Sequence, residues 1–127
     1  MVKGAVAMGL ILASIASAPA LAASDEVVVV GVPDGELAAA SLLAGRYEKA
    51  ADRLSAAWPD GANDPARLIN LGNAYVGLGR MKDAREAYVA ARFAPDSALL
   101  LANGAEASSR EVARRALGRL EASYAMR

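Results

Sequence analysis

The 127-residue sequence contains no cysteine and no histidine. Without cysteine the chain can form no disulfide and has no thiolate for a metal ion or a substrate. Without histidine it lacks the usual general base and the usual nitrogen ligand of zinc. The 14 basic and 14 acidic side chains cancel, so no net field draws nucleic acid or an acidic substrate to the protein. We therefore expect a protein without a metal, without another cofactor and without a nucleic-acid partner.

Large side chains are also scarce, because aromatic residues make up only 5% of the chain. Alanine is abundant instead, and the length predicts one domain of ordinary size. With this composition, a core has to come from helices that pack closely and have small residues at their contacts. The expected fold class is all-α.

The first 22 residues have the order of a secretory signal peptide. One lysine precedes an apolar run from Ala5 to Ile15, and the small residues of Ala20-Leu21-Ala22 follow. We expect cleavage after Ala22, with Ala20 as the neighbouring alternative. An uncleaved membrane anchor is the competing interpretation, but Pro19 interrupts the run and many of its residues are small. The mature chain is thus expected to be exported to a periplasm and to have no membrane span.

Residues 23–33 are expected to be extended. The four consecutive valines Val27–Val30 favour a β-strand, and Pro33 ends it. The residues after Pro33 have helical spacing, so the sequence offers this strand no partner within the chain. An unpaired apolar strand has to be covered or used. It can lie across the helical body, which we expect, or it can add to the sheet edge of another protein.

Capping residues, glycines and prolines divide the rest of the chain into short helices. Asp64-Pro65 combines a capping residue with a proline in the first turn. Gly45 is a stop signal, and Ser108 with Glu111 has the spacing of a capping box. The predicted helices cover residues 34–44, 47–58, 65 to about 78, 81–93, 97–107 and 108–124. Six helices with short turns between them predict three antiparallel hairpins.

One phrase occurs twice in this helical part. AGRYEKAADRL begins at residue 44 and LGRMKDAREAY begins at residue 78, which is 34 residues later. The same shift maps Gly45 onto Gly79 and Ala50 onto Ala84. Small residues at Gly72 and Ala84 would let two helices approach closely, and Gly79 would permit the turn between them. The period therefore predicts a repeated helix hairpin.

The second copy carries Leu71-Gly72-x2-Tyr75, then Ala84-x3-Tyr88, then Pro95. This pattern resembles the tetratricopeptide repeat, most specifically over residues 65–96. The likeness is weaker over residues 31–64, where Ser41 takes the place of an aromatic residue, and residues 97–127 would be a degenerate third unit. The resemblance implies that residues 34–127 fold as an α-solenoid of about three helix hairpins, preceded by the signal peptide and the extended segment.

Solenoids of this family ordinarily bind a peptide or protein segment in the groove that their first helices line. The resemblance places Ile69, Asn73, Val76, Ala39 and Leu42 in that groove. Asn73 can both donate to and accept from an extended peptide backbone, whereas Asn70 is expected to brace the adjoining hairpin. The implied function is a non-catalytic interaction module, or scaffold, of the cell envelope with a protein or peptide partner. The alternative is a structural envelope protein that self-associates, which makes a homo-oligomer possible.

An enzyme is the third class considered. Lys49 and Lys82 are the lysines that remain after processing, and either could serve a Ser-Lys dyad. Both are expected on solvent faces with no serine beside them. We therefore expect no catalytic activity.

Overall fold

The computed structural model of the protein describes residues 27–30, 37–56 and 62–125. This part is mostly helical, as the sequence predicts, and it also contains a small antiparallel sheet. Its elements are α1 (Ala39–Leu43), α2 (Tyr47–Ser55), α3 (Pro65–Gly77), α4 (Met81–Phe93), β1 (Ala98–Leu100), β2 (Glu106–Ser108) and α5 (Ser109–Ala125). Within the described ranges no helix is both long enough and apolar enough to cross a membrane. The expected signal peptide of residues 1–22 lies outside them, and so does Pro33.

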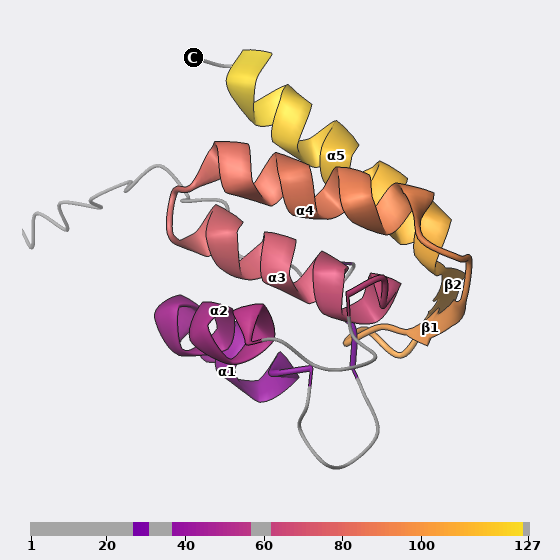
Figure 1. The fold of residues 1–127 in the computed structure, drawn as a ribbon, viewed down its shortest axis with the longest axis horizontal. Coiled ribbons are helices and arrows are strands. Elements are labelled where there is room, and N and C mark those ends of the chain that lie inside the picture. The colour runs from indigo at the N-terminus through magenta and orange to yellow at the C-terminus, as the bar shows by residue number, and fades with distance from the viewer. Residues whose placement is uncertain (1–26, 31–36, 57–61, 126–127) are drawn as a thin grey trace, which may run out of the picture.

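The helices stack in chain order. Helices α2, α3, α4 and α5 lie side by side, and α1 lies next to α2 (Figure 1). The first hairpin is α1 with α2, the second is α3 with α4, and α5 packs mainly against α4. Strands β1 and β2 lie at the end of the stack where α4 ends and α5 begins (Figure 1). The sheet is therefore close to one end of α3, which contributes most of the site described below.

The two helix hairpins turn in the same way. Gly45 and Gly79 have φ values of 74° and 76°, which glycine adopts without a steric penalty. In each turn the arginine after the glycine donates its backbone N–H to a carbonyl oxygen five residues earlier, at 2.8 Å. This bond satisfies a carbonyl that the end of the first helix would otherwise leave open. Two turns that lie 34 residues apart therefore have the same backbone conformation and the same hydrogen bond.

Helix α3 contacts both of its helical neighbours through glycines. A Cβ added at Gly72 would run into the ring of Tyr88 on α4, and one added at Gly77 would run into the ring of Tyr47 on α2. Ala84 on α4 is fully buried in the core cluster that also contains Tyr88. The prediction that Gly72 and Ala84 lie at close helix contacts is confirmed. Each glycine admits an aromatic ring where a longer side chain would hold the helices apart.

The expected helix over residues 97–107 is wrong, because these residues form the hairpin of β1 and β2. Leu99 pairs with Ala107, and the chain reverses at Asn103-Gly104, where Gly104 has a φ of 85°. Leu99 and Leu101 are buried while Leu100 is 48% exposed, which is the alternation of a strand. The described residues therefore contain two helix hairpins where three were expected. The third unit of residues 97–127 keeps only its last helix.

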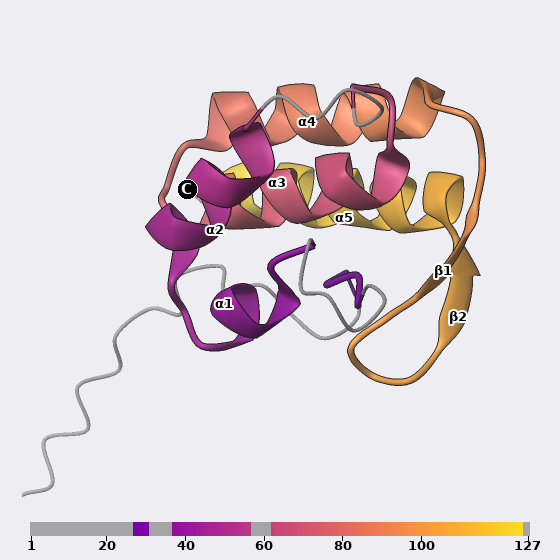
Figure 2. The ribbon, with the colours of Figure 1, turned by 60° about the horizontal axis from the view of Figure 1, so that its bottom comes forward.

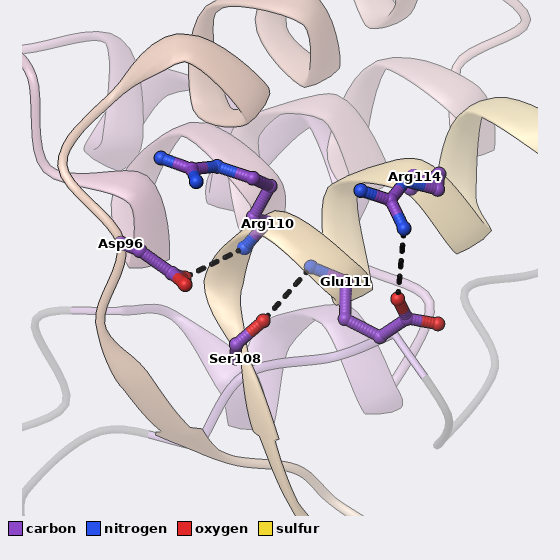
Figure 3. Close-up of polar contacts among 5 residues, drawn as sticks. All are labelled: Asp96, Ser108, Arg110, Glu111 and Arg114. Carbon is purple, nitrogen blue, oxygen red and sulfur yellow. Dashed lines mark hydrogen bonds and ion pairs between the residues drawn. The ribbon is translucent and has the colours of Figure 1, made fainter.

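Helix α5 is capped from two directions (Figure 3). The Ser108 Oγ accepts from the backbone N–H of Glu111 at 3.1 Å, as the capping-box spacing predicts. The Asp96 carboxylate accepts from the backbone N–H of Arg110 at 3.1 Å and from the Ser109 hydroxyl at 3.0 Å. These bonds, that of the Arg110 N–H first, hold the pKa of Asp96 below its ordinary value. A charge from a distant loop thus stabilises the start of the helix.

Candidate functional site

Asn70 on α3 binds the backbone of the valine segment Val27–Val30. Its Oδ1 accepts from the N–H of Val29 at 2.9 Å, and its Nδ2 donates to the carbonyl of Val29 at 2.8 Å. The same Nδ2 donates to the carbonyl of Leu37, two residues before α1, at 2.8 Å. Asn70 is fully buried. Because these bonds go to main-chain atoms, Asn70 recognises an extended backbone rather than a particular side chain.

Asn73, one turn further along α3, extends this network. Its Nδ2 donates to the carbonyl of Val27 at 2.8 Å and to the Oδ1 of Asn70 at 3.2 Å. The Tyr88 hydroxyl donates to the Asn73 Oδ1 at 2.6 Å, which fixes the amide so that its nitrogen faces the valine segment. Burial raises the pKa of Tyr88, so its hydroxyl keeps this proton throughout the physiological pH range. The network needs no charge, since every donor and acceptor in it is neutral.

The other edge of the valine segment pairs with the stretch that continues β1. Val30 donates to the carbonyl of Leu100 at 2.8 Å, and Ala102 donates to the carbonyl of Val28 at 2.9 Å. The segment therefore lies antiparallel to Leu100–Ala102 on one side and against the two asparagines on the other. Figure 2 shows it between α1 and β1. We call the site that the segment fills, between the two asparagines of α3 and Leu100–Ala102, the strand-binding cleft.

The valine side chains are buried on both faces of the segment. Val27 and Val29 join the core cluster that contains Ile69 and Leu101. Val28 points to the opposite face and joins the cluster that contains Leu42. Burying a side chain of this size contributes roughly 1.5 to 3 kcal/mol. The cleft therefore combines bonds that any backbone can make with apolar pockets of valine size.

Of the five expected groove residues, Asn73 binds the segment directly, and Ile69 and Leu42 belong to the two core clusters that contain its valines. Val76 and Ala39 pack against those clusters. Ile69, Asn73 and Leu42 are buried, and Ala39 and Val76 are half-buried. The part that these five residues play toward a partner stays a prediction.

The two asparagines differ from their expected roles. Asn73 was expected to bind the backbone of a partner peptide, and in the structure it binds the backbone carbonyl of Val27 of the same chain. Asn70 braces the adjoining hairpin through Leu37, as expected, and it also makes the two-bond contact with Val29 that the sequence-based interpretation missed. An asparagine on a helix gives no sign in the sequence of which backbone it meets.

The expected position of the valine segment is confirmed, because it lies across the helical body. The expectation that it has no partner strand is wrong, since Leu100–Ala102 supplies one. The sequence did contain a signal for this partner. An Asn-Gly pair between an apolar run and a second short segment is typical of a two-stranded hairpin. The prediction of a helix over residues 97–107 overlooked this turn signal.

Other candidate groups lie apart from the cleft. Lys49 and Lys82 are both exposed. Among the residues that the structure describes, no three acidic side chains lie close enough together to hold a metal ion. The strand-binding cleft contains Asn73, the residue that was expected to recognise an extended backbone.

The chain matches no family model, no curated protein and no solved structure. The resemblance to the tetratricopeptide repeat therefore depends on the chain's own residues, above all on the repeat of 34 residues and its two matching turns. These comparisons therefore suggest no activity and no partner for the chain.

Proposed function

We propose that the protein is a non-catalytic interaction module of the cell envelope, with a tetratricopeptide-like solenoid that receives an extended polypeptide segment. The single observation that supports this most is the two-bond contact between Asn70 and Val29. A buried amide that binds both backbone groups of one residue is suited to hold a strand of many sequences. The order of residues 1–22 supports export, and the matching turns at Gly45 and Gly79 support the solenoid.

The chemistry of the cleft defines the class of segment. Its hydrogen bonds come from amides, a hydroxyl and the main chain, and its pockets are apolar. The segment should therefore be extended and uncharged over three or four residues, with β-branched side chains on both faces. Because no charged side chain takes part in the bonds to Val27–Val30, salt should affect binding weakly.

A labelled peptide with the sequence of residues 25–32, DEVVVVGV, tests this proposal. Val28→Asp would place a charge at a fully buried position, so we expect the resident segment to leave the cleft. Fluorescence anisotropy should then show that the peptide binds this variant more tightly than it binds the unaltered chain. Circular dichroism at the same concentration checks that the helices remain, and Val28→Ser replaces Val28→Asp if they do not.

The matched control adds Asn70→Ala to Val28→Asp, which should abolish peptide binding. A second peptide with aspartate at its two central valines should not bind either variant. Equal binding with and without Asn70, while helicity is retained, would show that the cleft is not the binding site and would overturn the proposal.

A further inference from the structure

We propose that the strand-binding cleft of one copy accepts Val27–Val30 of a second copy, so that the protein assembles by exchanging this strand. The proposal depends on the proposed function, because it names the segment that the cleft receives. The partner in this proposal is a second copy of the same chain. The physical basis has three parts: the contacts of the strand, the backbone directly before α1, and the charge of the copies.

The contacts of the segment are the same whichever chain supplies it. Three bonds to the asparagines and two to Leu100–Ala102 all involve its main chain. Val27, Val28 and Val29 fill pockets that are already shaped for them and leave each at most 4% exposed. A second copy carries this sequence, so it satisfies the cleft as well as the resident strand does. Exchange of an identical element is a low-cost route to a dimer.

The backbone directly before α1 is strained. Ala38, directly before α1, has a φ of 54°, the left-handed conformation that alanine disfavours. Within the described ranges it is the one non-glycine residue with a positive φ. Backbone strain beside an exchangeable element favours exchange, because the strain at Ala38 can relax when the strand is placed in another copy. Exchange of the strand would thus release the strain at Ala38.

Charge does not oppose the association of two copies. The chain has 14 basic and 14 acidic side chains, and removal of residues 1–22 would take away only Lys3, so the net charge stays near zero and copies repel one another little at neutral pH. The uncharged cleft adds no local repulsion. Exchange should therefore depend on protein concentration and only weakly on salt.

The absence of native cysteine allows a direct test by disulfide cross-linking. Val30 and Leu100 lie opposite each other, joined by a backbone bond of 2.8 Å, and neither side chain is buried. Opposed residues of this kind have Cα atoms about 5.5 Å apart, within the range that a disulfide spans. One preparation carries Val30→Cys alone and the other carries Leu100→Cys alone. The two folded preparations are mixed without denaturant, at several concentrations, and then oxidised.

We expect a mixed dimer whose fraction rises with protein concentration, with mass spectrometry placing its disulfide between positions 30 and 100. The matched control mixes Val30→Cys with Val89→Cys, which puts a thiol on an exposed position of α4 that does not pair with the segment, and it measures random collision. The mixed pair should exceed this control several-fold. A yield equal to the control at all concentrations would overturn the proposal.

A chain with both substitutions, Val30→Cys and Leu100→Cys, distinguishes two negative results. In one, copies do not exchange strands; in the other, the segment does not occupy the cleft at all. If the double variant closes a disulfide within one chain when dilute while the mixed pair gives only background, copies do not exchange strands and the proposal is wrong. The cleft and the proposed function then stand. If the dilute double variant does not close either, the segment does not occupy the cleft and both proposals fail.

Discussion

The turn between α1 and α2 and the turn between α3 and α4 are built alike, but the helices that lead into them are not. Helix α3 has 13 residues, whereas α1 has five. Helix α3 begins at Pro65, after Asp64, whose carboxylate accepts from the N–H of Ala66 at 3.0 Å. Helix α1 begins after Ala38, whose methyl group cannot accept a hydrogen bond and whose backbone is left-handed.

The difference shows which features of a helix hairpin are local. A glycine, its neighbours and their hydrogen bonds produce the turn in both copies, regardless of the length of the helix before it. The start of a helix depends on where the preceding chain comes from. Before α1 the chain comes from the valine segment, and Asn70 holds it at Leu37. The left-handed Ala38 and the bond from Asn70 to Leu37 thus mark the start of this short helix.

The largest effect should come from Asn70, which has no counterpart in the first hairpin, where the residue 34 positions earlier is Glu36. Asn70→Ala leaves the N–H and carbonyl of Val29 and the carbonyl of Leu37 without their partner. Since each buried unpaired group costs about 1 to 3 kcal/mol and water can reach some of them, we expect a loss of about 3 kcal/mol in the free energy of unfolding. Urea denaturation measures it. Asn63→Ala, at an exposed position, should change little.

The second effect concerns Gly72, whose counterpart in the first hairpin is Ala38. Gly72→Ala drives a methyl group into the ring of Tyr88, which holds Asn73 in place. We expect a loss of about 2 kcal/mol from this overpacking. Gly118→Ala is the matched control, because a Cβ there meets nothing within 4 Å and should add about 0.5 to 1 kcal/mol of stability. Similar melting temperatures for the two variants would contradict the close contact of α3 with α4.

The third effect tests whether the two turns are equivalent. Gly45→Ala and Gly79→Ala each place a side chain in a left-handed conformation with no atom within 4 Å of the new Cβ. Only the backbone strain should count, so each variant should lose about 1 to 2 kcal/mol. Thermal melting should give two nearly equal losses. Losses that differ by more than the error of the measurement would show that the turns are not equivalent in energy.

The smallest effect extends the comparison to the C-terminal unit, where a β-hairpin replaces the first helix and the cap of α5 comes from Asp96. The pKa of Asp96 is held below its ordinary value of 3.8, so its carboxylate stabilises the folded chain above that pH. Its contribution should fall as the pH drops from 3.8 toward the lowered pKa. Asp96→Asn should thus melt below the unaltered protein near neutral pH, and the gap should narrow in acid. A gap of constant size throughout the acidic range would contradict the role of the charge.

The sequence predicted much of the helical part correctly. Helix α4 spans residues 81–93 as expected, α3 begins at Pro65, and Ser108 caps the last helix. These features depend on residues within one helical turn of each other. The 34-residue period supported the prediction, because the same turn signals occur in both copies. The hairpin of β1 and β2 was missed because a run of leucine and alanine suits a buried strand as well as a helix. Its Asn-Gly turn was the better signal.

By itself, then, the sequence determined the turns at Gly45 and Gly79, the close contacts at Gly72 and Ala84, and a valine segment that must be covered. Each follows from the conformational range or the size of one residue. The tertiary structure decided what covers the segment, because Val29 and Leu101 are far apart in the chain and become neighbours only after the helices stack. It also decided that Asn70 makes two hydrogen bonds to the valine segment, whereas Asn73 makes one. Which of two neighbouring amides meets a backbone depends on the position of that backbone in space, and no pattern of residues along α3 records it.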